Sequence, residues 1–145
     1  MIPAIPEELV GLVKACEGFS AKPYLCPAGF WTIGYGVLCA KDTPPITRKQ
    51  GEEQLYALLP KYAAQAYKLS PGLLGASVGR RTAIIDFVFN CGVARYASST
   101  LRRKVNAGDW VAASVEIQKW VWGGGKKLPG LVKRRAIESA LLLTC

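Results

Sequence analysis

Strand-forming residues gather in one short stretch of this chain, and helical patterns occupy most of the rest. Residues 22–25 and 31–35 favour strands, and the turn sequence Cys26-Pro-Ala-Gly29 separates them, which is typical of a small antiparallel hairpin or meander. An amphipathic helical pattern over residues 6–17 precedes this stretch and stops at Gly18, where glycine commonly ends a helix. The sequence therefore predicts a first helix that ends at Glu17, followed by a small β element.

The remainder of the chain carries helix signals. Thr47 and Gln50 fit a capping box that begins a helix running toward Ser70, with Pro60 as a kink or break. Beyond the turn-rich residues 71–79, helical patterns cover residues 82–91, 99–107, 109–120 and 129–143, with a glycine loop at 123–125. This order predicts an α+β fold, mainly α, in which a small antiparallel sheet lies beside a helical bundle in one domain of residues 1–145.

Composition narrows the possible chemistry. The chain has no histidine and five cysteines without CxxC spacing, so a zinc site, a histidine base or a Ser/His/Asp triad is not expected. No metal or organic cofactor is predicted. Most of the cysteines are expected to be small buried side chains in a reducing compartment.

The net charge of +9 is unevenly placed along the chain. Residues 1–72 hold seven Lys/Arg against six Asp/Glu, whereas residues 73–145 hold twelve against four. The basic second half predicts attraction to a polyanion such as nucleic acid, anionic lipid or the bacterial cell wall. Charge alone does not choose among these partners.

The sequence also bears on the compartment. No apolar run reaches the roughly 18 residues that a membrane span needs, and glutamates follow the first residues where a signal peptide has basic ones. No signal peptide or transmembrane segment is therefore predicted.

Glu17 is the candidate acid. A carboxyl group at a helix end, beside apolar and aromatic residues, can be kept protonated by burial and can then donate a proton to a leaving oxygen.

The spacing of residues after Glu17-Gly18 is specific. Eight residues separate Glu17 from Cys26, and five residues separate Cys26 from Thr32. This segment, which runs on through 31–36 (WTIGYG), resembles the catalytic segment of phage lysozymes, glycoside hydrolase family 24. Later blocks resemble the family in the same order: 83–92, 99–101, 105–109, and 130–135 with Glu138.

The resemblance implies a two-lobed lysozyme-like fold and hydrolysis of the β-1,4 bond between N-acetylmuramic acid and N-acetylglucosamine in peptidoglycan. It divides the chain into a β-containing lobe over about residues 18–46, a linking helix over about 47–70 and a helical lobe over about 80–145. Glu17 would protonate the glycosidic oxygen, while Cys26 and Thr32 would manage the water on the other face of the sugar. The saccharide groove would be lined by Leu38, Phe89 and Ser99.

Cys26 departs from the family pattern, which has aspartate at this position in its best-studied members. An inverting glycosidase holds its base roughly 6.5–9.5 Å from the acid, with room for a water. Three interpretations stay open: Cys26 is a thiolate base or nucleophile, which we favour; it is a polar placeholder; or it is oxidised to a sulfinate that mimics a carboxylate.

The resemblance favours an endolysin that lyses a host cell, accumulates in the host cytoplasm and reaches the wall through a separate membrane-permeabilising protein. Its expected partners are peptidoglycan and, through the basic surface and residues 129–143, anionic outer-membrane lipid; a monomer is expected. One alternative is a lytic transglycosylase acting on the same glycan with a single glutamate. The other is a non-enzymatic basic domain that binds nucleic acid or membrane, but no helix-turn-helix, RRM or zinc pattern supports it, so nucleic acid is not an expected partner.

Overall fold

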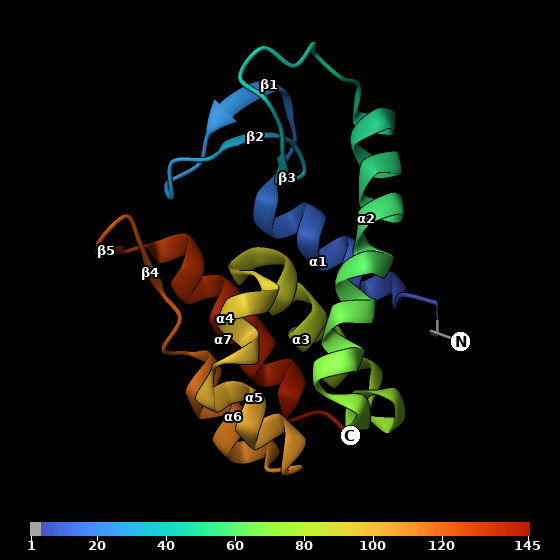
Figure 1. Cartoon of the computed structure of the whole chain (residues 1–145), viewed down its shortest axis with the longest axis vertical. Helices are drawn as coiled ribbons and strands as arrows, with labels where there is room; N and C mark the ends of the chain where they lie inside the picture. Colours follow the sequence, from blue (N-terminus) through green and yellow to red (C-terminus); the bar gives the residue numbers. More distant parts are fainter. Residues whose placement is uncertain (1–3) are drawn as a thin grey trace.

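The β element lies at one end of the molecule (Figure 1). In the computed structural model, which describes residues 4–145, helix α1 (Glu7–Glu17) leads into a three-stranded antiparallel sheet of order β1-β2-β3. Its strands are β1 (Ser20–Leu25), β2 (Trp31–Gly34) and β3 (Val37–Leu38). The register pairs Tyr24 with Thr32 and Thr32 with Leu38, so Thr32 occupies the middle strand.

The long helix α2 (Arg48–Leu69) runs from the sheet end toward the opposite end of the molecule (Figure 1). It begins with the predicted capping box, in which Thr47 and Gln50 exchange side chain to backbone hydrogen bonds. The helix continues through Pro60 without a break. The carbonyl left without a partner belongs to Tyr56, whose residue is exposed, so water can take the place of the missing N–H.

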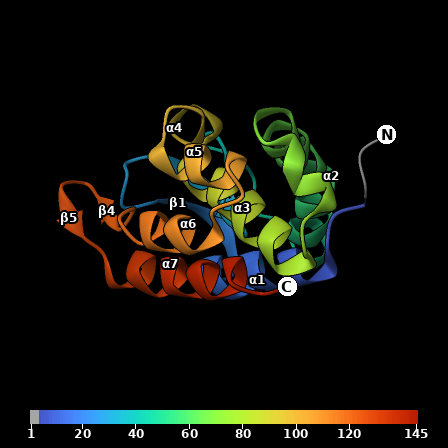
Figure 2. The same ribbon diagram turned by 90° about the horizontal axis from the view of Figure 1, so that it is seen from below.

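The remaining elements surround helix α3 (Val78–Cys91), which packs against α1, α2 and α7. Figure 2 shows α7 and α1 along the same side of the molecule. The other elements are η1 (Pro71–Gly75), α4 (Val93–Ala97), α5 (Thr100–Asn106), α6 (Trp110–Ile117), β4 (Trp122–Gly123), β5 (Lys126–Lys127) and α7 (Pro129–Leu142).

Two details differ from the sequence prediction. Helix α3 begins four residues earlier than predicted, because the Ser77 side chain accepts a hydrogen bond from the Arg80 N–H and caps the helix there. The predicted loop at 123–125 is the turn of a small hairpin, in which Trp122 pairs with Lys127. Two of its glycines, Gly124 and Gly125, have positive φ, the conformation that a tight hairpin turn requires.

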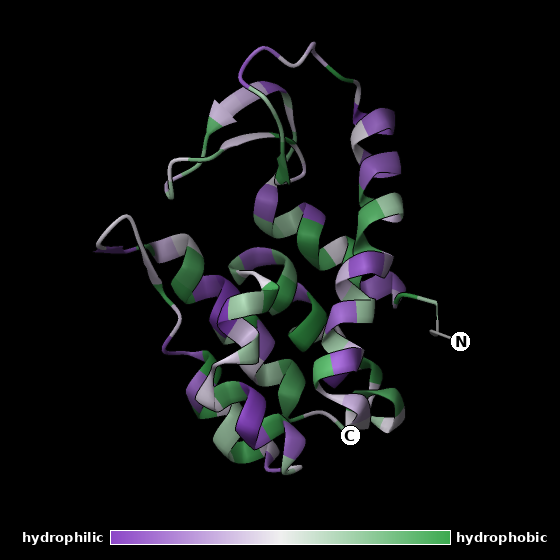
Figure 3. Cartoon of the chain, viewed as in Figure 1, coloured by the Kyte–Doolittle hydropathy of each residue, from purple (hydrophilic) through white to green (hydrophobic). Residues whose placement is uncertain are grey.

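The core lies where α3 meets its neighbours. The buried side chains of α3 include Ala83, Ile84, Ile85, Phe87 and Val88, and Figure 3 shows this helix largely in the hydrophobic colour. The predicted fold class, α+β and mainly α with a small antiparallel sheet next to Glu17, is confirmed. The division into two lobes stays a prediction. No helix among the described residues combines the length and the apolar composition needed to cross a membrane.

Candidate active site

Glu17 is the last residue of α1, and its side chain is only 17% exposed. The chain leaves the helix at Gly18, whose φ is +66° and whose N–H donates to the Lys14 carbonyl at 3.0 Å. The Glu17 carboxyl group lies against the turn between β2 and β3. A Cβ atom at Gly36, where φ is +83°, would lie 2.5 Å from Glu17 Cδ, so the close approach of backbone and carboxyl group requires glycine.

A buried arginine holds the Glu17 carboxylate from the side of α7. Arg134 is 4% exposed, and its Nη1 donates to Glu17 Oε1 at 2.5 Å. The same guanidinium donates from Nε and Nη2 to the two oxygens of Asp86 on α3, at 2.8 and 2.7 Å. Three elements, α1, α3 and α7, therefore fix the position of one carboxyl group.

Cys26 lies in the turn between β1 and β2. Its N–H donates to the Phe30 carbonyl at 2.9 Å, and its carbonyl accepts from the Gly29 N–H at 2.8 Å, so the backbone of the turn is closed by hydrogen bonds on both sides. The residue is partly buried and its thiol is free. The turn therefore holds a free thiol, which is not part of a disulfide, at the edge of the sheet.

Thr32 is almost fully buried in β2, at 4% exposure, and its hydroxyl donates to the Phe30 carbonyl at 3.0 Å. Since that bond uses the hydroxyl proton, the oxygen lone pairs remain available to accept a hydrogen bond.

Tyr24 connects the acid and the thiol electrostatically. Burial raises the pKa of the Tyr24 phenol, and negative charge on Glu17 and on Cys26 raises that pKa further. Tyr24 also pairs with Thr32 across the sheet. Tyr24 is thus paired with Thr32 in the sheet and is affected by the charges of Glu17 and Cys26.

The three predicted groove residues have different surroundings. Leu38 is 66% exposed on β3, directly beside Thr32. Phe89 lies on α3, where its ring meets that of Tyr62 edge to face with centroids 5.2 Å apart. Ser99 is buried and caps α5: its hydroxyl accepts from the Arg102 N–H and donates to the Tyr96 carbonyl.

The β4–β5 hairpin reaches the turn that carries Cys26. A Cβ atom at Gly124 would lie 3.0 Å from the Pro27 carbonyl oxygen, so the two turns are in contact range. The sequence alone gives no sign of this approach, because the turns are almost a hundred residues apart.

The sequence alone also assigns no role to Asp86, Arg134 or Gly36. A signal for Asp86 exists: it is a carboxylate inside the apolar run 83–89 of a predicted helix, and a buried carboxylate needs a charged or hydrogen-bonded partner. Among the described residues, no group of three or more His, Cys, Asp and Glu side chains is arranged to hold a metal ion.

Known proteins resemble this chain over almost its whole length. The family model described as phage lysozyme matches residues 14–138. An endolysin of Acyrthosiphon pisum secondary endosymbiont phage 1 is 37% identical over 143 residues, which cover 94% of this chain and 96% of the relative.

Two solved structures are similar over almost the whole chain. The muramidase domain of SpmX from Asticaccaulis excentricus has a TM-score of 0.83 and 28% identity, covering 97% of this chain and 98% of that one. An endolysin from Escherichia coli O157:H7 phage FAHEc1 has a TM-score of 0.80 and 28% identity, covering 96% and 92%. The resemblance of the Glu17 segment and the later blocks is thereby confirmed, and the chain belongs to the phage lysozyme family of glycoside hydrolases.

Proposed function

We propose that Glu17, Cys26 and Thr32 carry the reaction of this enzyme, a peptidoglycan-degrading endolysin that hydrolyses the β-1,4 bond between N-acetylmuramic acid and N-acetylglucosamine. The observation that carries the assignment is the position of Glu17, a mostly buried carboxyl group held by α1, the glycine turn and Arg134. Glu17 protonates the glycosidic oxygen as the bond breaks. The enzyme acts as a monomer.

Thr32 and Cys26 act on the water that attacks from the other face of the sugar. The Thr32 hydroxyl donates to the Phe30 carbonyl, so its oxygen accepts a hydrogen bond from the water and orients it. Cys26, at the neighbouring turn, removes the second proton of that water as a thiolate. With the acid on one side and the water on the other, the reaction inverts the configuration at the sugar carbon.

The groove assignments rest on different kinds of support. Leu38 is an exposed apolar side chain next to Thr32, where it can pack against the apolar face of a sugar ring. Phe89 lies one turn after Asp86 on α3, on the helix that supports Arg134. Ser99 already uses its hydroxyl in capping α5, so we propose that it supports the groove wall through that cap.

The products of digestion test this function against the transglycosylase alternative. Mass spectrometry of muropeptides released from purified sacculi is expected to show reducing N-acetylmuramic acid ends, because water is the nucleophile. A transglycosylase uses the hydroxyl of its own substrate and leaves 1,6-anhydro ends that are lighter by one water. Anhydro ends as the main product would contradict the hydrolytic mechanism.

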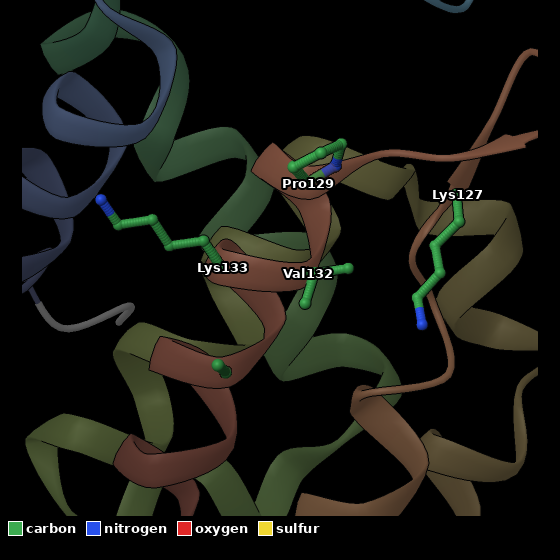
Figure 4. Close-up of a pocket in the computed structure, with 5 residues that line it drawn as sticks. Lys127, Pro129, Val132 and Lys133 are labelled. Atoms are coloured by element: carbon green, nitrogen blue, oxygen red, sulfur yellow. The ribbon is translucent and has the colours of Figure 1, made fainter.

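The proposed contact with anionic outer-membrane lipid rests on one surface. Lys127 and Lys133 flank a shallow pocket whose other lining residues are Pro129, Val132 and Ala136 (Figure 4). Figure 4 shows Lys133 extending from α7 toward α1 and Lys127 standing on the hairpin side. Two ammonium groups beside an apolar floor suit a lipid with an anionic headgroup.

Replacing both lysines by glutamine is expected to weaken binding to vesicles that contain anionic lipid by about thirtyfold, since each basic residue near such a surface contributes about 1 kcal/mol. Sedimentation with vesicles checks this, with neutral vesicles as the reference. Activity on purified sacculi should stay at the parent level, because neither lysine contacts Glu17, Cys26 or Thr32. Undiminished binding of the double variant would remove the lipid from the proposed partners.

A further inference from the structure

Behind Glu17 lies a buried set of ionisable groups that we call the arginine–carboxylate cluster. It consists of Glu17, Asp86, Arg134, Arg135 and Glu138. Asp86 and Glu138 are fully buried, Arg135 is 1% exposed and Arg134 is 4% exposed, so Glu17 is the member that reaches the surface.

Each arginine of the cluster has a carboxyl partner of its own. Arg134 donates from Nε and Nη2 to both oxygens of Asp86, the two-pronged geometry that makes such pairs strong. Arg135 Nε lies 2.6 Å from Glu138 Oε1, and its Nη2 donates to Oε2 at 3.0 Å. Glu17 is the third carboxyl group, held only by the remaining Nη1 of Arg134.

The cluster places two guanidinium groups against three carboxyl groups. A buried set of charges is strongly disfavoured unless it is compensated. Burial, followed by the hydrogen bond with Asp86 and then by the charge of Asp86, raises the pKa of Glu138 well above its ordinary value. Burial would also raise the pKa of Asp86, but the Arg134 guanidinium holds that pKa below its usual range. Asp86 is therefore the carboxylate that stays charged opposite Arg134.

We propose that Asp86 is a positioning residue for the reaction: by neutralising Arg134 it frees Glu17 from serving as the counter-ion, so that Glu17 can hold the proton it donates to the glycosidic oxygen. This inference rests on the proposed role of Glu17. Arg134 keeps its contact with Glu17 and fixes the carboxyl group, while the guanidinium charge is met by Asp86. Without Asp86 the only carboxylate paired directly with Arg134 would be Glu17, and opposite charge favours the ionised form.

Two ionisable groups near Glu17, the Tyr24 phenol and the Cys16 thiol, carry no charge near neutral pH. Burial, followed by the charges of Glu17 and Cys26, raises the pKa of Tyr24 on β1, and burial raises the pKa of Cys16 on α1. The nearest lysine along α1, Lys14, pairs with Glu52 of α2 at 2.8 Å. Among the described residues Arg134 is thus the cation in direct contact with Glu17.

The test is the pH–activity profile on purified sacculi for Asp86→Asn and Arg134→Gln. The profiles are measured with Cys26→Asp as the parent enzyme, because a carboxylate base ionises at low pH and the alkaline edge then marks loss of the proton from the acid. Asp86→Asn uncovers the positive charge of Arg134, so the edge is expected to move to lower pH by about one unit or more. Arg134→Gln removes that charge and leaves the carboxylate of Asp86 nearby, so the edge is expected to move to higher pH.

Both variants are expected to lose stability. If Asp86 and Arg134 had only a structural role, loosened packing would move both edges in the same direction or move neither. Shifts in opposite directions therefore indicate an effect of charge. Asp42→Asn is the matched control: it makes the same chemical change on an exposed residue outside the cluster, and its edge should stay at the pH of the parent. Circular dichroism confirms that each variant is folded at the assay temperature, and a shift of the Asp86→Asn edge to lower pH supports the proposal.

Edges that stay with the parent, or that move in the same direction in both variants, would overturn the role of Asp86. The Glu17→Gln variant distinguishes failure of the inference about Asp86 from failure of the proposed function. If that variant is inactive while the edges do not move, Glu17 keeps its role and only the inference about Asp86 falls. If Glu17→Gln remains active, both fall.

Discussion

Replacing Glu17 by glutamine is expected to lower the rate of sacculus digestion by about 10²- to 10⁴-fold, the range over which positioned proton transfer acts. Glutamine keeps the shape and the hydrogen-bonding oxygen of the side chain, and Arg134 Nη1 can still donate to that oxygen. What the amide cannot do is donate an acidic proton to the glycosidic oxygen. The measurement is the initial rate of turbidity loss of purified sacculi at several enzyme concentrations.

Glu8→Gln is the matched control, because it makes the same chemical change on an exposed residue of the same helix. It should digest sacculi at the parent rate. Thermal unfolding of Glu17→Gln followed by circular dichroism should show a folded protein at the assay temperature, so that inactivity reports lost chemistry. A Glu17→Gln variant as fast as Glu8→Gln would show that another group supplies the proton.

The local signals in the sequence predict the fold well where they act over a few residues. The Thr47–Gln50 capping box and the start of the last helix at residue 129 appear where the sequence predicts them, and Asp109 caps the helix predicted to begin there. Short elements are missed for the same reason: α4 has five residues and β5 has two, too few for a period to show. Pro60 does not break its helix, because the Tyr56 carbonyl that it leaves without a partner belongs to an exposed residue and can be hydrated.

The sequence predicts only some residues of the candidate site. The residues close to Glu17 in the sequence belong to a recognisable motif, whereas the others reach the site only when the helices pack together. Glu17, Cys26 and Thr32 lie within sixteen residues of one another, and their spacing can be compared with a family. Asp86 and Arg134 come from helices that begin more than sixty and one hundred residues after Glu17. Their meeting depends on α1, α3 and α7 packing together, which no short sequence pattern encodes.

The proposed catalytic residues differ from a pair of catalytic carboxylates at Cys26, which provides a thiol in place of the second carboxyl group. A thiol and a carboxyl group have different ordinary pKa values, near 8.5 and near 3.9, so exchanging one for the other changes the pH range in which such a base is ionised. Cys26 lies in a turn whose backbone is held by two hydrogen bonds, so a replacement of similar size can occupy the same place. The two side chains therefore differ in charge and titration more than in position.

Cys26→Ala is expected to lose about a hundredfold of the activity, since no group remains to take the second proton from the attacking water. Cys26→Asp is expected to retain activity and to extend it to lower pH, because a carboxylate stays ionised where a thiol does not. Rates on sacculi across the pH range test both variants. Cys39 is another partly buried free cysteine, so Cys39→Ala is the control and should match the parent.

The mass of the intact parent enzyme distinguishes a free thiol from a sulfinate, which adds two oxygen atoms. Full activity of Cys26→Ala would leave Glu17 and Thr32 as the whole of the catalytic machinery, because a methyl group can neither accept nor orient a proton.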